Sequence, residues 1–435
     1  MENVDRLYAL FKKSTGVCTD TRSIEKGNLF FALTGPNFNA NNFAKQALEK
    51  GASAVVVSEE IEDVNEDNCF VVEDTLAALQ ALALFHRKQL KIPVIAITGS
   101  NGKTTTKELM ATALSVKYKT YATHGNLNNH IGVPLSLLAI DDTYEMAIIE
   151  MGANHIGEIA AYCEIARPDY GLITNIGKAH IGEFGGFENI IIGKSELFDF
   201  LKKNEGTAFI NTNDPVLKNM TKRFDQPVTF PNAEDAFYAE LLAKKVFLKI
   251  KVSDIEFDTQ LIGQYNFNNV AAALAVANYF EVPMQSATEA ITKYQPENMR
   301  SQLIETDDYL IILDAYNANP DSMRAAVESL CTTTNGESVT ILGDMLELGE
   351  MSALEHEKIA ELVVDLGVSR RIYFGELIKQ ANETDPFGTF FTNKEVLLKH
   401  LSEQPIKKGS TILIKGSRKN ALEDLMQVLA TDYSV

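Results

Sequence analysis

The sequence has few cysteines, no long apolar run and no excess of positive charge. Its four cysteines (Cys18, Cys69, Cys163 and Cys331) lie far apart without a Cys-x-x-Cys pair, which argues against a zinc site and indicates free thiols in a reducing compartment. No apolar segment reaches the ~18 residues of a membrane span, and the N-terminus lacks a basic segment followed by an apolar core. We therefore expect a cytoplasmic protein without membrane insertion.

The charge balance excludes another group of functions. Acidic residues outnumber basic residues by 59 to 40, so the formal net charge is −19. Non-specific binding to nucleic acids or anionic membranes needs positive charge, so we expect no nucleic-acid partner. Glycine and proline are not enriched, which argues against collagen-like or long disordered segments. The 435 residues exceed one ordinary core and predict two or three domains of about 100–200 residues each.

The most informative stretch is a glycine turn between a strand and a helix. Val94–Thr98 is a short β-branched run that predicts a buried strand, and Gly99–Gly102 is the turn. Such a turn surrounds an anion with backbone N–H groups at a helix N-terminus. Lys103 adds a positive charge for the outer phosphates of a nucleoside triphosphate, and Thr104 adds a hydroxyl for Mg²⁺. The usual phosphate-loop spacing would put a first glycine at position 97, which is isoleucine here, so the match is to the shorter Gly-x-x-Gly-Lys-Thr form. An ordinary glycine-rich turn between a strand and a helix is the alternative.

The remaining pattern divides the chain into three α/β segments, which we expect to be domains at residues 1–91, 92–301 and 302–435. We expect a small N-terminal α/β domain, a central ATPase-like domain with a parallel sheet, and a Rossmann-like C-terminal domain without a phosphate loop. Within them, Val246–Val252 predicts an antiparallel edge strand, and Ala421–Leu429 predicts a last helix.

Three polar residues of the central segment are candidates for a functional site, two of them at or after strand ends and one on a helix. Glu150 ends a strand that begins at Met146, and His180 follows the next strand. In an open parallel sheet the ligand crevice lies at the carboxyl ends of the strands, where both residues would bind a divalent metal. A solvated glutamate and an ordinary polar histidine are the alternatives. Lys194 lies on a predicted helix, where its local sequence favours no function.

Together these stretches closely resemble the Mur ligase family, the ATP-dependent amide-forming enzymes of peptidoglycan precursor synthesis. The resemblance covers nearly the whole chain and rests on Thr98–Thr106, Gly125–Gly132, Glu150–Gly152, Thr174–His180, Lys194, Asn266, Asn269 and Asp314–Pro320. Three further stretches resemble the members that add D-alanyl-D-alanine, namely Tyr316–Met323, Gly343–Gly349 and Lys415–Arg418.

The resemblance implies roles for the matching residues. ATP would bind at Gly99, Ser100, Asn101, Gly102, Lys103, Thr104, Thr105, Asn269, Arg300 and Asp314. Mg²⁺ would bind at Thr104, and a second Mg²⁺ at Glu150 and His180 with support from a carbamate on Lys194; the catalytic residues would be Lys103, Glu150, His180 and Lys194. The substrates would contact Thr21, Arg22, Ser23, Asn128, Asn129, Asn317 and Asn319. Two stretches depart from many relatives, Tyr265-Asn266 on the adenine side and Asn39–Asn41 on the uridine side.

The resemblance also implies a reaction. A UDP-N-acetylmuramoyl-tripeptide would be activated by ATP as an acyl phosphate and then attacked by the amine of D-alanyl-D-alanine, with the protein acting as a monomer whose domains close around the reactants. Other Mur-type ligases, which add meso-diaminopimelate or lysine, and a folylpolyglutamate-synthase-like ligase are alternatives. A phosphate-loop regulator that hydrolyses ATP slowly is an alternative of another class.

Overall fold

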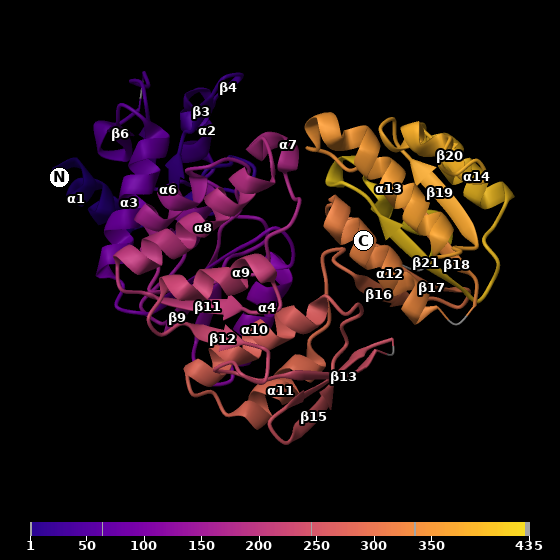
Figure 1. Cartoon of the computed structure of the whole chain (residues 1–435). Coiled ribbons are helices and arrows are strands. Elements are labelled where there is room, and N and C mark those ends of the chain that lie inside the picture. The colour runs from indigo at the N-terminus through magenta and orange to yellow at the C-terminus, as the bar shows by residue number, and fades with distance from the viewer. Residues whose placement is uncertain (1, 63, 245, 335, 431–435) are drawn as a thin grey trace.

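The computed structural model of the chain describes residues 2–430 apart from 63, 245 and 335. Its elements form three α/β domains in chain order, with the C-terminal domain set beside the other two (Figure 1). The expected α/β fold with parallel sheets is confirmed, whereas the boundaries after residues 91 and 301 stay predictions. Within the described residues, no helix has the length and apolar character needed to cross a bilayer.

The N-terminal domain has a parallel sheet in the order β1-β2-β5-β6. A short hairpin, β3 with β4, projects from it. The strands are β1 (Val17–Cys18), β2 (Leu29–Phe31), β3 (Thr34–Gly35), β4 (Phe38–Asn39), β5 (Ala54–Val57) and β6 (Cys69–Val71), and the helices are α1 (Glu2–Phe11), α2 (Ala44–Glu49) and α3 (Thr75–Gln89).

The central domain has a parallel six-stranded sheet in the order β12-β11-β10-β7-β9-β8. Every residue of β7 (Val94–Thr98) is buried, as expected for a β-branched strand covered on both faces. Its neighbours are β9 (Met146–Glu150) and β10 (Tyr170–Ile173), and both run parallel to it. The carboxyl ends of these three strands therefore meet at one edge. The outer strands are β8 (Thr120–Ala122), β11 (Thr207–Asn211) and β12 (Val228–Phe230).

Helices cover both faces of the central sheet. One face packs on α5, α6 and α8 and continues without a break into the N-terminal domain through Leu79 and Leu82 of α3. The other face packs on α4, α10 and α11. The helices are α4 (Lys103–Leu114), α5 (Gly132–Leu138), α6 (Glu158–Ala166), α7 (Ile181–Phe184), α8 (Phe187–Lys203), α9 (Pro215–Met220), α10 (Asn266–Tyr279) and α11 (Met284–Lys293).

The antiparallel strand expected near Val246–Val252 belongs to a separate sheet. Strand β14 (Leu248–Val252) lies between β13 (Glu240–Lys244) and β15 (Ile255–Asp258), and both pair with it in antiparallel fashion. Alternate residues of β14 are buried, so one face packs on the core and the other meets solvent. The antiparallel strand was predicted correctly, but its place at an edge was wrong: β14 is the middle strand of a separate sheet, and the central sheet ends at β12.

The C-terminal domain has a six-stranded sheet in the order β16-β17-β21-β18-β19-β20, in which only the β16–β17 pair is antiparallel. The helix expected over Ala421–Leu429 is present from residue 422, as a 3₁₀ turn over Leu422–Leu425 followed by the short α15; it starts after Ala421, whose φ of +45° lies outside the right-handed helical region. The elements are β16 (Gln302–Glu305), β17 (Tyr309–Asp314), α12 (Pro320–Thr333), β18 (Ser338–Gly343), α13 (Ser352–Asp365), β19 (Arg370–Phe374), β20 (Thr389–Phe391), α14 (Lys394–Glu403), β21 (Ser410–Lys415) and α15 (Met426–Leu429).

Candidate active site

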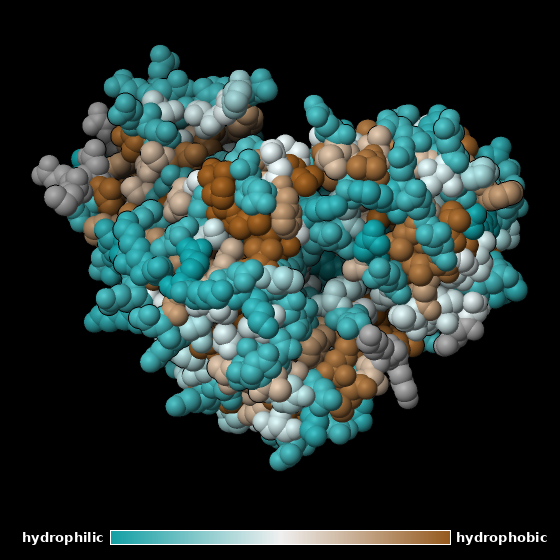
Figure 2. Space-filling view, in the orientation of Figure 1, coloured by the Kyte–Doolittle hydropathy of each residue, from teal (hydrophilic) through white to brown (hydrophobic). Residues whose placement is uncertain are grey.

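A cavity of about 630 Å³ lies where the carboxyl ends of β7, β9 and β10 face the C-terminal domain. Figure 2 shows a hydrophilic hollow between the two domains on this face of the molecule. The predicted site residues that line the cavity are Ser100, Asn101, Gly102, Lys103, Thr104, Thr105, Asn128, Asn129, Glu150, His180, Asn269, Arg300, Asp314, Asn317 and Asn319. The fold therefore gathers most of the predicted residues in one place.

The turn after β7 requires glycine at two positions. Gly99 has a φ of +142° and Gly102 a φ of +76°, and L side chains rarely adopt either conformation. A Cβ on Gly99 would lie 2.0 Å from Thr174 Oγ1, and one on Gly102 would lie 2.6 Å from Asn269 Oδ1. Thr174 and Asn175 also hold the Asn101 backbone with three hydrogen bonds of 2.6–3.0 Å. The loop is thus preorganised by close contacts with β10 and α10.

Lys103 begins α4 and folds back over this loop. Its Nζ donates hydrogen bonds to Gly99 O at 2.8 Å and to Ser100 O at 3.3 Å. Desolvation, with a smaller contribution from the nearby Arg300 charge, outweighs the attraction of Glu150 and lowers the pKa of Lys103 to about 8. An anion bound at the loop would favour the charged form of this amine.

Glu150 is buried at the end of β9, and one of its oxygens accepts no hydrogen bond. Its Oε1 accepts hydrogen bonds from Asn128 Nδ2 at 2.8 Å and Thr104 Oγ1 at 3.3 Å. Its Oε2 is buried and accepts no hydrogen bond, and it forms an ion pair with the buried Lys107 Nζ at 3.8 Å. A buried carboxylate oxygen without a donor, beside a hydroxyl, is the ligand set that a hard divalent cation prefers. The arrangement fits Mg²⁺.

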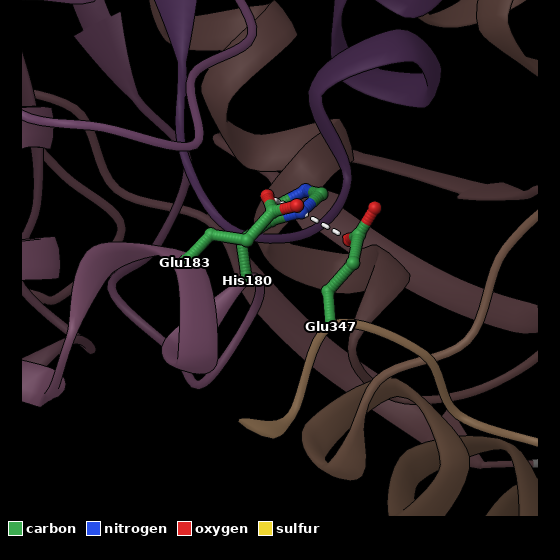
Figure 3. Close-up of side chains that lie close together, drawn as sticks. All are labelled: His180, Glu183 and Glu347. Atoms are coloured by element: carbon green, nitrogen blue, oxygen red, sulfur yellow. Dashed lines mark ion pairs between the residues drawn. The ribbon is translucent and has the colours of Figure 1, made fainter.

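His180 lies at the interface with the C-terminal domain. Its Nδ1 forms an ion pair with Glu347 and is 3.6 Å from Glu183 Oε2 (Figure 3). The contact with His180 holds the pKa of Glu347 below its usual value despite partial burial. Among the described residues, the metal-ligand atoms that gather within 4.8 Å of one another are those of His180, Glu183 and Glu347. His180 and Glu150 line the same cavity but do not form one cluster of this kind.

Lys194 is 1% exposed and lies behind the cavity on α8. Its Nζ donates a hydrogen bond to Ala153 O at 2.9 Å and lies 5.2 Å from the centre of the Phe184 ring. Burial, with added repulsion from Lys103, lowers the pKa of Lys194 well below its ordinary value. Burial therefore favours a neutral, nucleophilic amine at this position.

On the opposite side of the loop, Asn269 connects α10 to α4 and is held by Asn266 of its own helix. Asn269 Oδ1 accepts a hydrogen bond from Thr106 Oγ1 at 3.0 Å, and its Nδ2 donates to Asn266 Oδ1 at 2.7 Å. In the C-terminal domain, Asp314 Oδ2 accepts a hydrogen bond from Lys415 Nζ at 2.8 Å. These bonds give each buried polar group a partner and fix it at the cavity wall.

Direct hydrogen bonds join the central and C-terminal domains around the cavity. Asn319 Nδ2 donates to Asn101 Oδ1 at 2.7 Å, so an amide of the glycine loop contacts the N-cap residue of α12. Asp321 Oδ2 accepts a hydrogen bond from the Lys178 N–H at 2.6 Å, and Lys178 Nζ donates to Glu355 Oε1 at 2.9 Å. The C-terminal domain is therefore docked against the loop that carries the nucleotide-type turn.

Comparison with known proteins identifies the chain. Residues 97–277 match the Mur ligase middle domain, and residues 299–418 match the Mur ligase, glutamate ligase domain. The chain is 34% identical over 426 residues to the UDP-N-acetylmuramoyl-tripeptide–D-alanyl-D-alanine ligase of Bacillus subtilis (strain 168), covering 95% of this chain and 93% of the relative. The chain belongs to the Mur ligase family. The resemblance indicated by its motifs is confirmed.

Other relatives of this Mur ligase agree. The ligase of the same name from Escherichia coli (strain K12) is 33% identical over 95% of this chain and 93% of its own length. A crystal structure of MurF from Acinetobacter baumannii superposes with a TM-score of 0.87 at 32% identity, over 98% of both chains. The MurF ligase of Thermotoga maritima, solved in complex with ADP, superposes with a TM-score of 0.83 at 26% identity, over 97% and 98% of the two chains.

Some predicted residues lie away from the cavity of this Mur ligase. Arg22 is exposed in the N-terminal domain and forms a 2.7 Å ion pair with Asp20, while the neighbouring Thr21 and Ser23 also lie outside the cavity lining. Asn129 lines the cavity, but its side chain caps α5 by accepting hydrogen bonds from the backbone N–H groups of Ile131 and Gly132. The assignments of these residues to substrate binding stay predictions.

Sequence reasoning missed several cavity residues because their partners are distant in the chain. Lys107 does not line the cavity itself but lies 3.8 Å from the cavity residue Glu150, and only its spacing of one helical turn from Lys103 marks it in the sequence. Tyr316, Lys415 and Asn175 lie within stretches that carried the family resemblance, yet nothing local distinguishes their side chains. Glu347 lies outside these cavity residues and is found only through its contact with His180.

Proposed function

We propose that this Mur ligase joins the amine of D-alanyl-D-alanine to a carboxylate of UDP-N-acetylmuramoyl-tripeptide, with ATP as the phosphoryl donor. The cavity carries the proposal, because in it the glycine loop and Glu150 face the first turn of α12. Relatives that match this chain over 95% of its length carry the name of this reaction. The alternative, an amine such as meso-diaminopimelate or lysine, needs the same loop and differs only in what the C-terminal domain accepts.

ATP supplies the leaving group in this reaction, because an amine cannot readily displace oxide from a free carboxylate but can displace phosphate from an acyl phosphate. The substrate carboxylate attacks the γ-phosphorus of ATP, the bond to the β-phosphate oxygen breaks, and ADP leaves behind an acyl phosphate. The amine then attacks the acyl carbon, the C–O bond to phosphate breaks, and the amine loses a proton. In this scheme the N-terminus of α4 and Lys103 bind the phosphate oxygens while negative charge shifts onto ADP.

The residues present fit Mg²⁺ as the partner of ATP. Thr104 Oγ1 and Glu150 Oε2 would hold one ion, and His180 with its two carboxylate neighbours would hold another. A bound Mg²⁺ neutralises charge on the phosphate and carboxylate oxygens. Lys194, with a pKa far below its ordinary value, is proposed to carry a carbamate near these ligands.

The docked C-terminal domain is proposed to bring the amine substrate to the acyl group. The Asn101–Asn319 contact joins the glycine loop to α12, so the wall that receives the amine is attached to the loop that receives ATP. Holding the reactants together with water excluded accelerates both steps. We propose that residues 1–91 bind the nucleotide end of the muramyl substrate, 92–301 bind ATP and 302–435 bind the dipeptide, in a cytoplasmic monomer.

Phosphate release from ATP tests this proposal directly. The purified protein is supplied with ATP and Mg²⁺, a UDP-muramyl peptide and an amine, and each component is omitted in turn. We expect phosphate only when UDP-N-acetylmuramoyl-tripeptide and D-alanyl-D-alanine are both present. Faster ligation of a UDP-muramyl dipeptide with diaminopimelate or lysine would show that the protein catalyses the reaction of another Mur ligase. Hydrolysis of ATP without either acceptor would support a regulator.

A pair of lysine variants checks that the cavity performs the reaction. Lys103→Ala removes the cation at the loop and is expected to lower turnover by about 10²-fold or more without unfolding the protein. Lys202→Ala removes an exposed lysine from the last turn of α8 and is expected to leave turnover unchanged. Equal turnover of the two variants would contradict the assignment.

A further inference from the structure

The segment that joins the central and C-terminal domains has an unusual backbone. Asn298, Met299 and Ser301 have φ values of +60°, +56° and +50°, although none is glycine. Residues with side chains occupy this left-handed region only where surrounding contacts impose it, and such conformations gather at functional sites. The one residue enclosed by them, Arg300, lines the cavity.

Contacts from both domains hold this segment in place. The Tyr316 N–H donates a hydrogen bond to Met299 O at 3.3 Å, and the Ser301 N–H donates to Asp314 Oδ1 at 3.2 Å. The hydroxyls of Tyr265 and Ser301 are 2.6 Å apart. The backbone on both sides of Arg300 is therefore fixed by residues at the end of β17 and the start of α10.

The Arg300 side chain is held by an aromatic ring. Its guanidinium carbon lies 3.8 Å from the centre of the Tyr316 ring. In the described part of the chain, Arg300 takes part in no ion pair within 4.0 Å, so no carboxylate neutralises its positive charge. A ring stacked on the flat face of a guanidinium leaves the N–H edge available for a bidentate contact with a phosphate.

We propose that Tyr316 is a positioning residue, which holds the Arg300 guanidinium for the nucleotide phosphates. Tyr316 belongs to the C-terminal domain, so the phosphate contact of Arg300 depends on that domain being docked. The inference rests on the proposed use of ATP but not on which amine is ligated. It excludes a direct contact of the Tyr316 ring with the nucleotide as the main contribution of this residue.

The test measures ADP binding by calorimetry in the presence of Mg²⁺, without either acceptor substrate. Tyr316→Phe keeps the ring and should bind ADP within about twofold of the unchanged protein. Tyr316→Leu and Tyr316→Met remove the ring, and each should weaken ADP binding by about tenfold. All three keep the backbone N–H that contacts Met299, and thermal unfolding identifies any variant that does not fold.

A double-mutant cycle separates positioning from direct contact. In an Arg300→Ala background, Tyr316→Leu should change ADP binding by less than about twofold, because the group it positions is already absent. An equal loss in both backgrounds, or no loss in the unchanged background, would overturn the inference. Tyr118→Leu is the matched control, since it removes a ring 5.0 Å from Lys117 Nζ outside the cavity and should leave ADP binding unchanged. If the phosphate-release assay fails with the proposed substrates while the ADP-binding results are as expected, only the proposed substrates are rejected, and the role of Tyr316 stands.

Discussion

One hydrogen bond that docks the C-terminal domain is formed where residue 177 has no side chain. The Lys178 N–H donates a hydrogen bond to Asp321 Oδ2 at 2.6 Å, and a Cβ on Gly177 would lie 2.4 Å from the same oxygen. Ordinary Cβ contacts begin at 3.4 Å, so a methyl group needs the carboxylate to retreat by about 1 Å. Gly177 is not among the glycines with a positive φ, so alanine introduces no backbone strain there.

The expected effect of Gly177→Ala follows from the bond that it breaks. A hydrogen bond to a charged acceptor contributes about 1.5–3 kcal/mol. Loss of that free energy from the docked arrangement lowers the docked-to-undocked ratio by roughly 10- to 150-fold. We expect turnover in the phosphate-release assay to fall by about tenfold or more, and small-angle X-ray scattering to show a larger radius of gyration.

A second substitution determines whether the clash itself is responsible. Asp321→Ala removes the oxygen that a methyl group on residue 177 would meet, so Gly177→Ala should have little further effect in that background. Gly35→Ala is a matched control, because a Cβ there meets nothing within 4 Å. Unchanged turnover and scattering for Gly177→Ala, or an equal loss in the Asp321→Ala background, would refute the reasoning.

Three further predictions concern titratable groups. Because the pKa of Lys103 is about 8 and bound phosphate favours its charged form, ADP binding should take up protons and weaken as the pH rises above 8; calorimetry in buffers of different ionisation enthalpy measures the uptake, which Lys103→Gln should abolish. A carbamate on Lys194 should give a ¹³C carbonyl signal after incubation with ¹³C-bicarbonate, and Lys194→Ala should lose turnover that short-chain carboxylic acids partly restore; no signal in the active protein would contradict it. Burial raises the pKa of Asp385, but hydrogen bonds from Arg371 and Tyr373 outweigh burial and hold it below its usual value. The ionised Asp385 carboxylate therefore stabilises the fold fully above pH ~4, and this stabilisation is lost as the pH falls through the lowered pKa. Asp385→Ala should lower the free energy of unfolding, measured with urea at pH 7, by about 3–5 kcal/mol.

Local sequence was sufficient for the strands and the glycine loop. The β7 strand was predicted with the bounds that the structure has, because a short β-branched run between turns has few other stable conformations. Gly99 and Gly102 were identified in the same way, since a strand–turn–helix connection needs a permissive backbone at fixed spacing. The left-handed Ala421 that precedes the last helical stretch was missed, because a left-handed alanine has no signature in the sequence.

The parts of the site that only the tertiary structure decided are those with partners in another domain. Sequence reasoning grouped His180 with Glu150 and Lys194, yet the structure pairs His180 with Glu347 of the C-terminal domain. The contact of the Arg300 guanidinium with the Tyr316 ring, between residues 16 positions apart, was likewise visible only in the tertiary structure. Hydrophobic period and turn chemistry are local properties, so the sequence by itself determined the α/β elements, the loop and the family. Side-chain pairing across a domain interface depends on how separately formed cores dock, which no local pattern encodes.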